Sequence, residues 1–396
     1  MNNYILHNGI IITPFKTINN CNLFIENGKI SKLLNGRINI FNKENYEIID
    51  LENKFYVSPG LIDIHTHGGG GEDCVCGDLE VISKDKLKQG ITGYLPTLIA
   101  SPLNLIYKSF KNINNYIDDK KNQNLPKILG IHIEGIYLSQ KYRGAQRLDY
   151  LRKPDVNECM EIIKNSNGLL KIMTLAPELD NCLEVIELLS NYGIISSIGH
   201  SNATIEQAAL AIEKGATHVT HAFNAMGEME FKEPGVRRPG LEGYVLIRDE
   251  LKLEVIGELT HVDPSIMEIV FRTKGPNNII LVTDSLSVSG LSPGKYSIGV
   301  MTLILSEENP CVARLEDGGL AGSIIPLIKA VENFYKNTSA TINQAIQMAS
   351  YNPAESLGLL NKKGSIEIGK DADLIIFDKN FKIKKVFIEG NLVFES

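Results

Sequence analysis

Cysteine is scarce in this sequence, and its placement excludes a structural zinc site built from thiols. Six cysteines are spread over 396 residues, and only Cys74 and Cys76 lie close together. No second close pair accompanies them, so the four thiolates of such a site are missing. We expect reduced thiols in a cytoplasmic protein.

Long apolar runs and blocks of positive charge are also missing. No stretch approaches the roughly 20 apolar residues of a membrane-spanning helix. The first fifteen residues lack a basic segment followed by an uninterrupted apolar one, so we expect no signal peptide. The net charge is −7, and the absence of a basic block argues against nucleic acid as a partner. An anionic substrate would need a local basic pocket.

The composition is that of an ordinary globular protein, with β-like segments at both ends. Hydrophobic residues make up 43% of the chain, so a core of good size can form. Strand-like runs separated by turn residues cover 4–12, 22–25, 29–34 and 46–51, and then 373–377, 383–388 and 392–394. Neither end is long enough for a core of its own. We expect residues 1–57 and 359–396 to form one small β-sandwich domain.

The middle of the chain, residues 58–358, alternates apolar strands with helical or loop segments. Eight strands are predicted, at 61–64, 93–99, 128–133, 170–174, 194–198, 218–220, 253–256 and 279–282. Amphipathic helices are predicted at 203–214, 264–272 and 323–336. This rhythm favours an α/β fold, a (β/α)8 barrel of the TIM type. An open doubly wound sheet is the alternative, but no G-x-G-x-x-G follows its first strand.

The first predicted barrel strand ends in His65 and His67. Residues two apart on a strand share a face, so both imidazoles can point at one ion. Four glycines at 68–71 then let the chain leave the strand at a sharp angle. By itself the pair does not decide between a metal site and two hydrogen-bonded histidines.

Other strand ends carry residues of the same chemistry. Active sites of such barrels form at the carboxyl ends of the strands. Glu134, His200 and His221 lie at the ends of the third, fifth and sixth predicted strands, and the seventh leads into His261. A glutamate with two histidines supplies three ligands to a catalytic zinc ion and leaves one position open for water. Each residue alone would be explained as a hydrogen-bonded strand end, but the set at one barrel mouth favours a metal.

Asp284 follows the eighth predicted strand and needs a separate role. A carboxylate there can accept a proton from metal-activated water and then deliver it to the leaving group. A helix N-cap or a loop carboxylate is the alternative. The position at the end of the eighth strand favours catalysis.

Motifs along nearly the whole chain resemble a known family. They are Pro-Gly-Leu-Ile-Asp at 59–63 with the His-x-His, His-Ile-Glu-Gly at 132–135, Ala-Pro-Glu at 176–178, Gly-His-Ser-Asn-Ala at 199–203, Thr-His-Ala-Phe-Asn-Ala-Met at 220–226, Val-Thr-Asp at 282–284, Leu-Ala-Gly-Ser at 320–323 and the tail at 364–374. Together they resemble the N-acetylglucosamine-6-phosphate deacetylases of the amidohydrolase superfamily.

The resemblance implies hydrolysis of the N-acetyl group of a 6-phosphorylated amino sugar, with release of acetate. It implies Glu134, His200 and His221 as ligands of the main metal, and Asp284 as general base and then acid. The ion would be divalent, with zinc expected first and iron, manganese or cobalt as alternatives. The histidine pair of the first strand would hold a second ion where the site has two.

The resemblance also implies substrate contacts and a partner subunit. Phosphate contacts in this family can come from the neighbouring subunit, so we expect a homodimer. The residues expected at the sugar phosphate are Ala145, Gln146, Asn224, Ala225, Lys232, Arg238, His261, Leu320, Ala321 and Gly322.

Some positions depart from the family pattern, and all of them lie in the half of the site that holds the substrate. Ile136 replaces the usual proline after Glu-Gly, and Gln146 stands where histidine is common. Glu-Leu at 258–259 replaces Asp-Gly. The reaction class is therefore better supported than the identity of the sugar.

A basic segment also differs from the family. Lys232 replaces an arginine, and lysine keeps the charge but not the fork that matches a phosphate group. Arg237 and Arg238 follow and could bind phosphate in its place. A solvated basic loop would explain all three.

Two other functions stay open from the sequence. One is an amidohydrolase that acts on another N-acyl sugar phosphate, such as the galactosamine epimer, or on a cyclic amide. A dinuclear member of that kind would use a lysine at the end of the fourth strand, whereas Lys171 lies at its start. The other is a sugar-phosphate binding protein without catalysis, which would not need both a metal set and Asp284.

Overall fold

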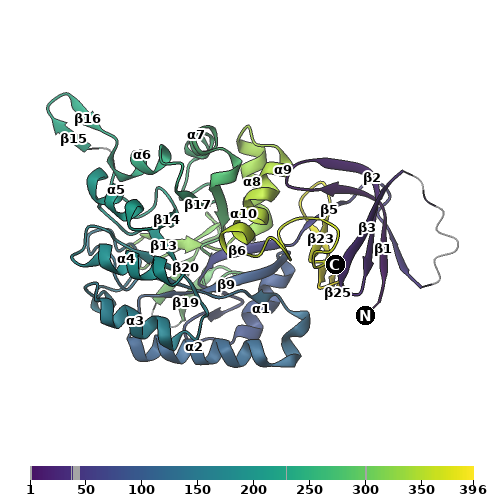
Figure 1. The fold of residues 1–396 in the computed structure, drawn as a ribbon, viewed down its shortest axis with the longest axis horizontal. Coiled ribbons are helices and arrows are strands. Elements are labelled where there is room, and N and C mark those ends of the chain that lie inside the picture. The colour runs from purple at the N-terminus through teal and green to yellow at the C-terminus, as the bar shows by residue number, and fades with distance from the viewer. Residues whose placement is uncertain (1, 37, 39–44, 229, 299–300) are drawn as a thin grey trace.

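The computed structural model describes residues 2–36, 38, 45–228, 230–298 and 301–396. Figure 1 shows a barrel of strands and helices with a β-sheet beside it, and both ends of the chain lie in that sheet. The predicted α/β barrel with a small β domain built from the two termini is confirmed.

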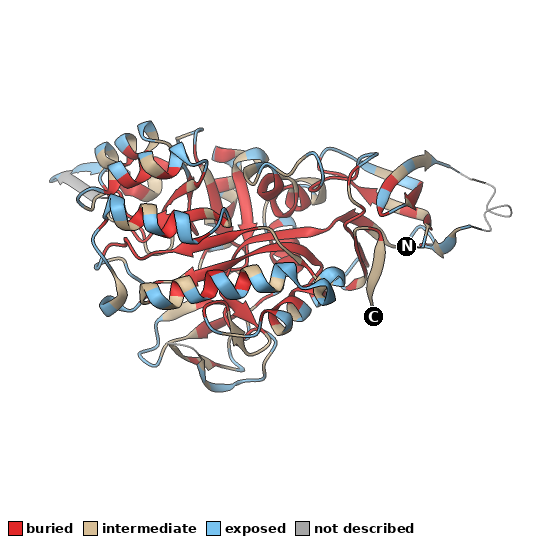
Figure 2. Cartoon of the chain, turned by 60° about the horizontal axis from the view of Figure 1, so that its bottom comes forward, coloured by how far each residue is buried: buried red, intermediate tan, exposed pale blue. Residues whose placement is uncertain are grey.

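Eight parallel strands of the described residues form the barrel. Neighbouring strands pair in the order β6, β9, β11, β12, β13, β14, β17 and β18. Their bounds are Leu61–Thr66, Ile91–Ile99, Ile131–Glu134, Leu170–Leu175, Ile195–Ile198, Ala216–Val219, Lys252–Ile256 and Ile279–Val282. They are buried almost throughout, as Figure 2 shows, which is why each reads as a nearly continuous apolar run. The strand predicted at 128–133 is divided, because β10 (Lys127–Ile128) ends before Gly130, whose φ is 149°.

The barrel closes between its first and last strands through side chains as well as backbone. A parallel bridge joins Thr66 to Ser285, just beyond β18. The hydroxyl of Thr283 donates to the carboxylate of Asp63 at 2.6 Å, and both residues are fully buried. This contact fixes the end of β18 against β6, where two of the predicted site segments meet.

Ten α-helices are found in the described residues. Their bounds are Leu79–Lys88 (α1), Leu103–Asp118 (α2), Val156–Asn165 (α3), Cys182–Asn191 (α4), Ile205–Glu213 (α5), Gly240–Leu246 (α6), Pro264–Lys274 (α7), Leu327–Asn337 (α8), Ile342–Ala349 (α9) and Tyr351–Ser356 (α10). Three short 3-10 helices cover Lys120–Asn124, Leu148–Tyr150 and Pro276–Asn278. Several helices begin after a side chain that caps the first turn, such as Asp78, Asp155 and Thr204.

The two ends of the chain share one sheet, in the order β25-β24-β23-β5-β1-β2-β3, with β4 also pairing with β1. The bounds are Tyr4–Ile12 (β1), Thr17–Glu26 (β2), Lys29–Asn35 (β3), Glu47–Asp50 (β4), Tyr56–Pro59 (β5), Leu374–Phe377 (β23), Ile383–Ile388 (β24) and Asn391–Glu395 (β25). A small core that includes Leu6, Leu23 and Phe387 lies against it. Since β5 runs on to Pro59 inside this sheet, the division of the chain at residues 57 and 359 stays a prediction.

The sequence did not reveal a four-stranded antiparallel sheet that is inserted after β18. It contains β19 (Gly294–Ile298), β20 (Met301–Leu305), β21 (Val312–Arg314) and β22 (Leu320–Ser323). Residues 320–322, expected only as contacts of the sugar phosphate, lie in a strand, and α8 begins at Leu327 rather than at residue 323. Two small hairpins were missed as well, β7 (Gly68–Gly69) with β8 (Glu72–Asp73) and β15 (Glu230–Glu233) with β16 (Val236–Arg238).

Candidate active site

Six predicted site residues meet at the mouth formed by the carboxyl ends of the barrel strands. They are His65, His67, Glu134, His200, His221 and Asp284. They come from β6 and the position directly after it, from the end of β11, and from the segments directly after β13, β14 and β18. Positions far apart in the sequence thus share one place because parallel strands end on the same side of the barrel.

Glu134, His200 and His221 form one group of potential metal ligands. Oε1 of Glu134 lies 3.0 Å from Nε2 of His200 and 2.9 Å from Nε2 of His221. The two Nε2 atoms are 3.1 Å apart. Three atoms that can each give a lone pair to the same ion therefore point at one spot.

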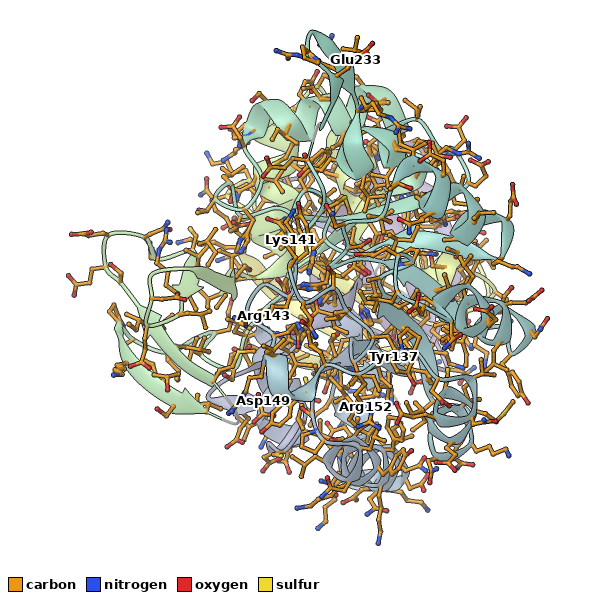
Figure 3. All side chains as sticks on the ribbon, turned by 90° about the vertical axis from the view of Figure 1, so that its left-hand side faces the viewer. Tyr137, Lys141, Arg143, Asp149, Arg152 and Glu233 are labelled. Carbon is orange, nitrogen blue, oxygen red and sulfur yellow. The ribbon has the colours of Figure 1, made fainter. Side chains whose placement is uncertain are left out.

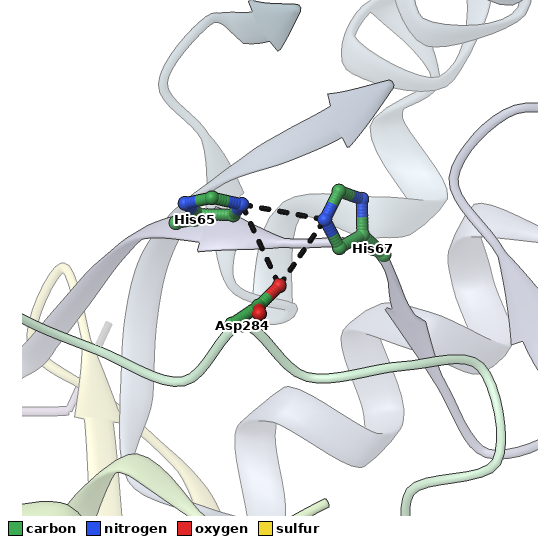
Figure 4. Close-up of side chains that lie close together, drawn as sticks. All are labelled: His65, His67 and Asp284. Carbon is green, nitrogen blue, oxygen red and sulfur yellow. Dashed lines mark hydrogen bonds and ion pairs between the residues drawn. The ribbon is translucent and has the colours of Figure 1, made fainter. Parts of the chain in front are cut away.

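His65, His67 and Asp284 form a second such group next to the first (Figure 4). Their facing nitrogens are 3.3 Å apart, and Oδ1 of Asp284 lies 3.2 Å from Nε2 of His67. Glu134 joins the groups, since its two oxygens lie 3.4 Å from His65 Nε2 and 3.3 Å from His67 Nε2. A carboxylate between two ligand sets can contact an ion on either side.

The donor set fits a divalent metal of the zinc type. Four imidazole nitrogens and the carboxylates of Glu134 and Asp284 offer nitrogen and oxygen ligands with no thiolate. All six residues are buried at the floor of the barrel mouth. Such a set costs free energy unless a cation balances its charge and lone pairs.

Electrostatics at this point favour positive charge. Burial lowers the pKa of His67, but the nearby carboxylates of Asp284 and Glu134 outweigh burial and raise that pKa to about 9. Burial also lowers the pKa of His65, but the carboxylates of Glu254 and Glu134 outweigh burial and raise it. Burial would raise the pKa of Glu134, yet contacts with His200 and its neighbours hold it well below the usual range. Protons and a metal ion would compete for the same nitrogens.

Three of the site residues have left-handed backbone conformations. The φ angles of His200, His221 and Asp284 are 47°, 27° and 46°. Residues other than glycine rarely adopt this region, and each such residue costs on the order of 1 kcal/mol or more. The tight turn directly after each strand directs these side chains into the barrel mouth. We interpret the strained backbone as the free-energy cost of pointing these three side chains into the barrel mouth.

Hydrogen bonds on the far side of each ring orient the histidines. Nδ1 of His65 donates to Glu254 at 2.8 Å, and Nδ1 of His200 donates to the carbonyl oxygen of Tyr142, also at 2.8 Å. Nδ1 of His67 donates to the carbonyl oxygen of Thr97 at 3.1 Å. In each case Nε2 is left with a free lone pair toward the cluster.

Glu254 was not predicted, although the sequence held a signal. It is a lone glutamate in the apolar strand β17, and its side chain is fully buried. A charged residue in such a position is rare unless it has a partner. His132, by contrast, is a histidine of the core. Its ring contacts the carbonyl oxygen of Ile64 and the hydroxyl of Thr174, and burial holds its pKa well below the ordinary value.

A cavity opens directly over the cluster, and three of the predicted substrate residues line it. Ala145, Gln146 and Ala321 share this cavity with Glu134 and Asp284. Ile99, Leu286 and Met301 complete its apolar side and were not predicted. The side-chain amide of Gln146 donates to Glu134 and accepts a bond from the backbone N–H of Ala100.

The other predicted substrate residues occupy positions around this cavity. Ala225 lies beside the loop at Gly144 and His200. The side-chain amide of Asn224 donates to the carbonyl oxygen of His221 at 3.3 Å. Leu320 and Gly322 lie in β22, which runs beside the backbone of Asp284.

His261 is held by the residue that departs from the family pattern. Nδ1 of His261 lies 2.7 Å from Oε1 of Glu258, which also accepts from the backbone N–H groups of Thr260 and His261. Burial lowers the pKa of His261, but Glu258 outweighs burial and raises it. The longer Glu258 side chain thus keeps an acidic partner for this imidazole.

The basic segment lies on the exposed hairpin β15–β16, which projects from the barrel at the upper left of Figure 1. Arg238 forms an ion pair with Glu206 at 2.5 Å. The side chain of Lys232 lies outside the described residues. Arg238 is thus engaged with a carboxylate in this subunit and not placed at the cavity over the cluster.

Comparison with known proteins agrees with this architecture. A model of the amidohydrolase family matches residues 56–393. The chain belongs to the amidohydrolase family. An N-acetylglucosamine-6-phosphate deacetylase from Lysinibacillus sphaericus is 34% identical over 344 residues, which is 85% of each chain. One from Bacillus subtilis (strain 168) is 33% identical over 391 residues, 98% of this chain and 96% of the relative.

Solved structures are similar over the full length. The N-acetylglucosamine-6-phosphate deacetylase from Pasteurella multocida has a TM-score of 0.88 and 30% identity, and the match covers 98% of this chain and 99% of that one. A variant of the enzyme from Mycobacterium smegmatis, solved with N-acetyl-D-glucosamine-6-phosphate, has a TM-score of 0.88 and 25% identity over 99% of this chain and 100% of that one. Among the helices described here, none combines the length and the apolar character needed to cross a membrane.

Proposed function

We propose that this amidohydrolase removes the N-acetyl group from an amino-sugar 6-phosphate, N-acetylglucosamine 6-phosphate first, to give glucosamine 6-phosphate and acetate. The proposal rests above all on the convergence of Glu134, His200 and His221 with Asp284 at the barrel mouth. It is supported by relatives of that activity that align along nearly the whole chain.

The metal ligands are Glu134, His200 and His221, with His65 and His67 for a second ion. A bound divalent ion would lower the pKa of a water molecule and polarise the amide carbonyl. Zinc is our first expectation, with iron, manganese or cobalt as alternatives. Glu134 is the one carboxylate in the described residues that lies within 3.4 Å of the Nε2 atoms of both histidine pairs, so it would serve either one ion or two.

Asp284 acts first as base and then as acid. Its Oδ1 faces the ligand cluster at 3.2 Å from Nε2 of His67, so a water molecule held there lies within reach of the carboxylate. The buried histidines lower the pKa of Asp284 against the opposing effect of burial, which keeps it ionised and able to accept a proton. The same proton then passes to the nitrogen of the departing amine.

The substrate lies over the cavity with its sugar toward β14, β17 and the loop after β11. Ala145, Gln146, Asn224 and Ala225 contact the sugar from two sides of that space, and residues 320–322 contact it from β22. Gln146 also positions Glu134, because its amide donates to that carboxylate. His261, whose pKa Glu258 raises against the opposing effect of burial, receives the phosphate.

Basic residues beyond His261 complete the phosphate site. Arg143 and Lys141 lie on the loop after β11, near the centre of the face shown in Figure 3, and Nη1 of Arg143 donates to the carbonyl oxygen of Gln146 at 2.7 Å. Lys232 and Arg238 are carried on the projecting hairpin and act on the neighbouring subunit of a homodimer. We place the enzyme in the cytoplasm, where phosphorylated sugars are retained.

Acetate release from a small panel of substrates tests the proposal. Purified protein loaded with zinc, manganese, iron or cobalt is offered N-acetylglucosamine 6-phosphate, its galactosamine epimer, and N-acetylglucosamine without phosphate. We expect the first to give the highest kcat/KM and the unphosphorylated sugar the lowest. A higher kcat/KM with the galactosamine epimer would favour that epimer as substrate. No acetate from any of them with any ion would overturn the assignment.

A further inference from the structure

An apolar chamber adjoins the cavity over the metal ligands and shares one wall with it. His67, Ile99, Leu286 and Met301 line both spaces. The chamber continues behind them between Val75, Cys76, Ile298 and Leu303. The chamber is therefore a side pocket of the cavity over the proposed metal ligands and not a separate surface pocket.

The chamber lies at β9, across the barrel from the proposed sugar residues that follow β14. Its walls come from β9, from the segments after β6 and β18, and from the β19–β20 hairpin. Asn224 and Ala225 follow β14, and His261 follows β17; in the closed barrel these strands are four and three positions away from β9. In a bound amide the carbonyl carbon stands between the sugar nitrogen and the acyl tail. With the carbonyl over the ligand cluster and the sugar on one side, the tail points to the other side.

The polar groups in the walls are largely used within the protein. The hydroxyl of Thr97 accepts from the backbone N–H of Thr66 and donates to the carbonyl oxygen of Leu95. The carboxylate of Asp73 accepts from the backbone N–H groups of Val75 and Cys76. Ser101 and Ser287 also line the chamber, and Oγ of Ser101 has no hydrogen-bond partner in the described residues. The rest of the wall is mainly hydrocarbon and sulfur, which suits an aliphatic group.

The chamber is larger than an acetyl group requires. Its volume is about 40 Å³, and about 10–15 Å³ on this measure holds one water molecule. A single methyl group would leave space for about two more groups of that size. With only a methyl group bound, the atoms that line the chamber would lack van der Waals contacts that a longer tail would make.

We infer that this chamber binds the acyl tail and that the enzyme also hydrolyses N-acyl amino-sugar 6-phosphates with tails of three or four carbons. The inference rests on the proposed function and extends it from N-acetyl to N-propionyl and N-butyryl substrates. The reaction stays a hydrolysis: water adds across the amide, the C–N bond breaks, and the products are the amino-sugar phosphate and the free carboxylic acid.

The test compares the acetyl, propionyl and butyryl derivatives of glucosamine 6-phosphate with the metal-loaded enzyme. We expect kcat/KM for the butyryl compound within about tenfold of that for the acetyl compound, because one methylene in an apolar pocket changes rates by roughly 10- to 200-fold when it does not fit. Hydrolysis of the acetyl compound alone would overturn the inference and leave the proposed function standing. Hydrolysis of none would overturn both.

Variants in β19 test whether the hydrolysis of longer acyl tails depends on this chamber. Ile298 faces the chamber, whereas the neighbouring Ser297 is exposed on the opposite face of the strand. We expect Ile298→Phe to lower the butyryl-to-acetyl ratio of kcat/KM by about tenfold or more and Ile298→Ala to raise it. Ser297→Phe, which adds the same ring outside, should leave the ratio unchanged. Equal loss with all three substrates in Ile298→Phe would contradict the assignment of the chamber.

Discussion

Glu254 accepts a hydrogen bond from Nδ1 of His65 at 2.8 Å, and both side chains are fully buried. The carboxylate determines which ring nitrogen carries the proton, so Nε2 of His65 faces His67 and Asp284 with its lone pair free. It also accepts from the backbone N–H of His221 at 3.3 Å, which links the two ligand groups. One carboxylate outside the cluster therefore aligns ligands on both sides of it.

Replacement of Glu254 should weaken metal binding without removing a ligand. In Glu254→Gln the neutral amide still reaches His65 but no longer raises the basicity of the ring. We expect metal affinity to fall by about 10- to 100-fold, first at the His65–His67 side. Titration of the metal-free protein, with metal content measured after dialysis, checks this. Glu268→Gln on the exposed side of α7 is the control, and equal affinity in both variants would refute the role of Glu254.

Asp284 should be needed for turnover more than for metal binding. Asp284→Asn keeps the shape of the side chain but cannot accept a proton, so we expect kcat to fall by about 10²- to 10⁴-fold. The three proposed ligands of the main ion are untouched, so metal bound at Glu134, His200 and His221 should remain. Steady-state kinetics and elemental analysis on one preparation separate the two effects. Asp180→Asn, an exposed aspartate, should behave as the unmodified protein does.

Gly322 allows β22 to pass close to the backbone of Asp284. A Cβ atom at this position would lie 2.9 Å from the carbonyl oxygen of Asp284 and 2.9 Å from Cγ of Leu286, so one of the two segments must move. Gly322→Ala should displace the carboxylate of Asp284, the proposed base, and lower kcat by about tenfold or more, since small misplacements at a reacting centre are costly. Acetate release measures this. Gly294→Ala in the same sheet meets ordinary contacts at 3.4 Å or more and should retain activity.

The barrel could be predicted from the sequence because each strand is an apolar run and each ends in a polar residue. The positions of Glu134, His200 and His221 at one mouth followed from the parallel direction of the strands. Glu254 escaped prediction because nothing local shows that its partner, His65, is 189 residues away. The β19–β22 sheet escaped because its strands are short and half-exposed, so their apolar pattern is weak.

On the substrate side of the site, too, the sequence predicted only some of the residues. Ala145, Gln146 and Ala321 were expected from family motifs, and the structure places them at the cavity. Leu286 and Met301 carry no motif, and only the fold of the insertion brings Met301 to the cavity wall. Arg238 on the hairpin has an ion pair with Glu206 in this subunit, and the sequence held no sign of it.

Glu242 should make stability depend on pH. Burial together with repulsion from Glu228 raises the pKa of Glu242 from 4.5 to about 7. The folded state therefore holds this proton more tightly than the unfolded state does, and the free energy of unfolding falls as the pH rises from about 4.5 to about 7. Above that window the loss is complete. Because the side chain is half-buried and partly screened by water, we expect a change of roughly 1 kcal/mol.

Glu242→Gln removes this pH dependence, since an amide does not ionise. We expect the variant to be more stable than the unmodified protein at pH 8 and equal to it at pH 4, as judged from urea unfolding at both values. Glu213→Gln at the exposed end of α5 should change neither midpoint. An equal gain in the free energy of unfolding for Glu242→Gln at both pH values would mean that packing, rather than the raised pKa of the carboxyl group, accounts for the difference.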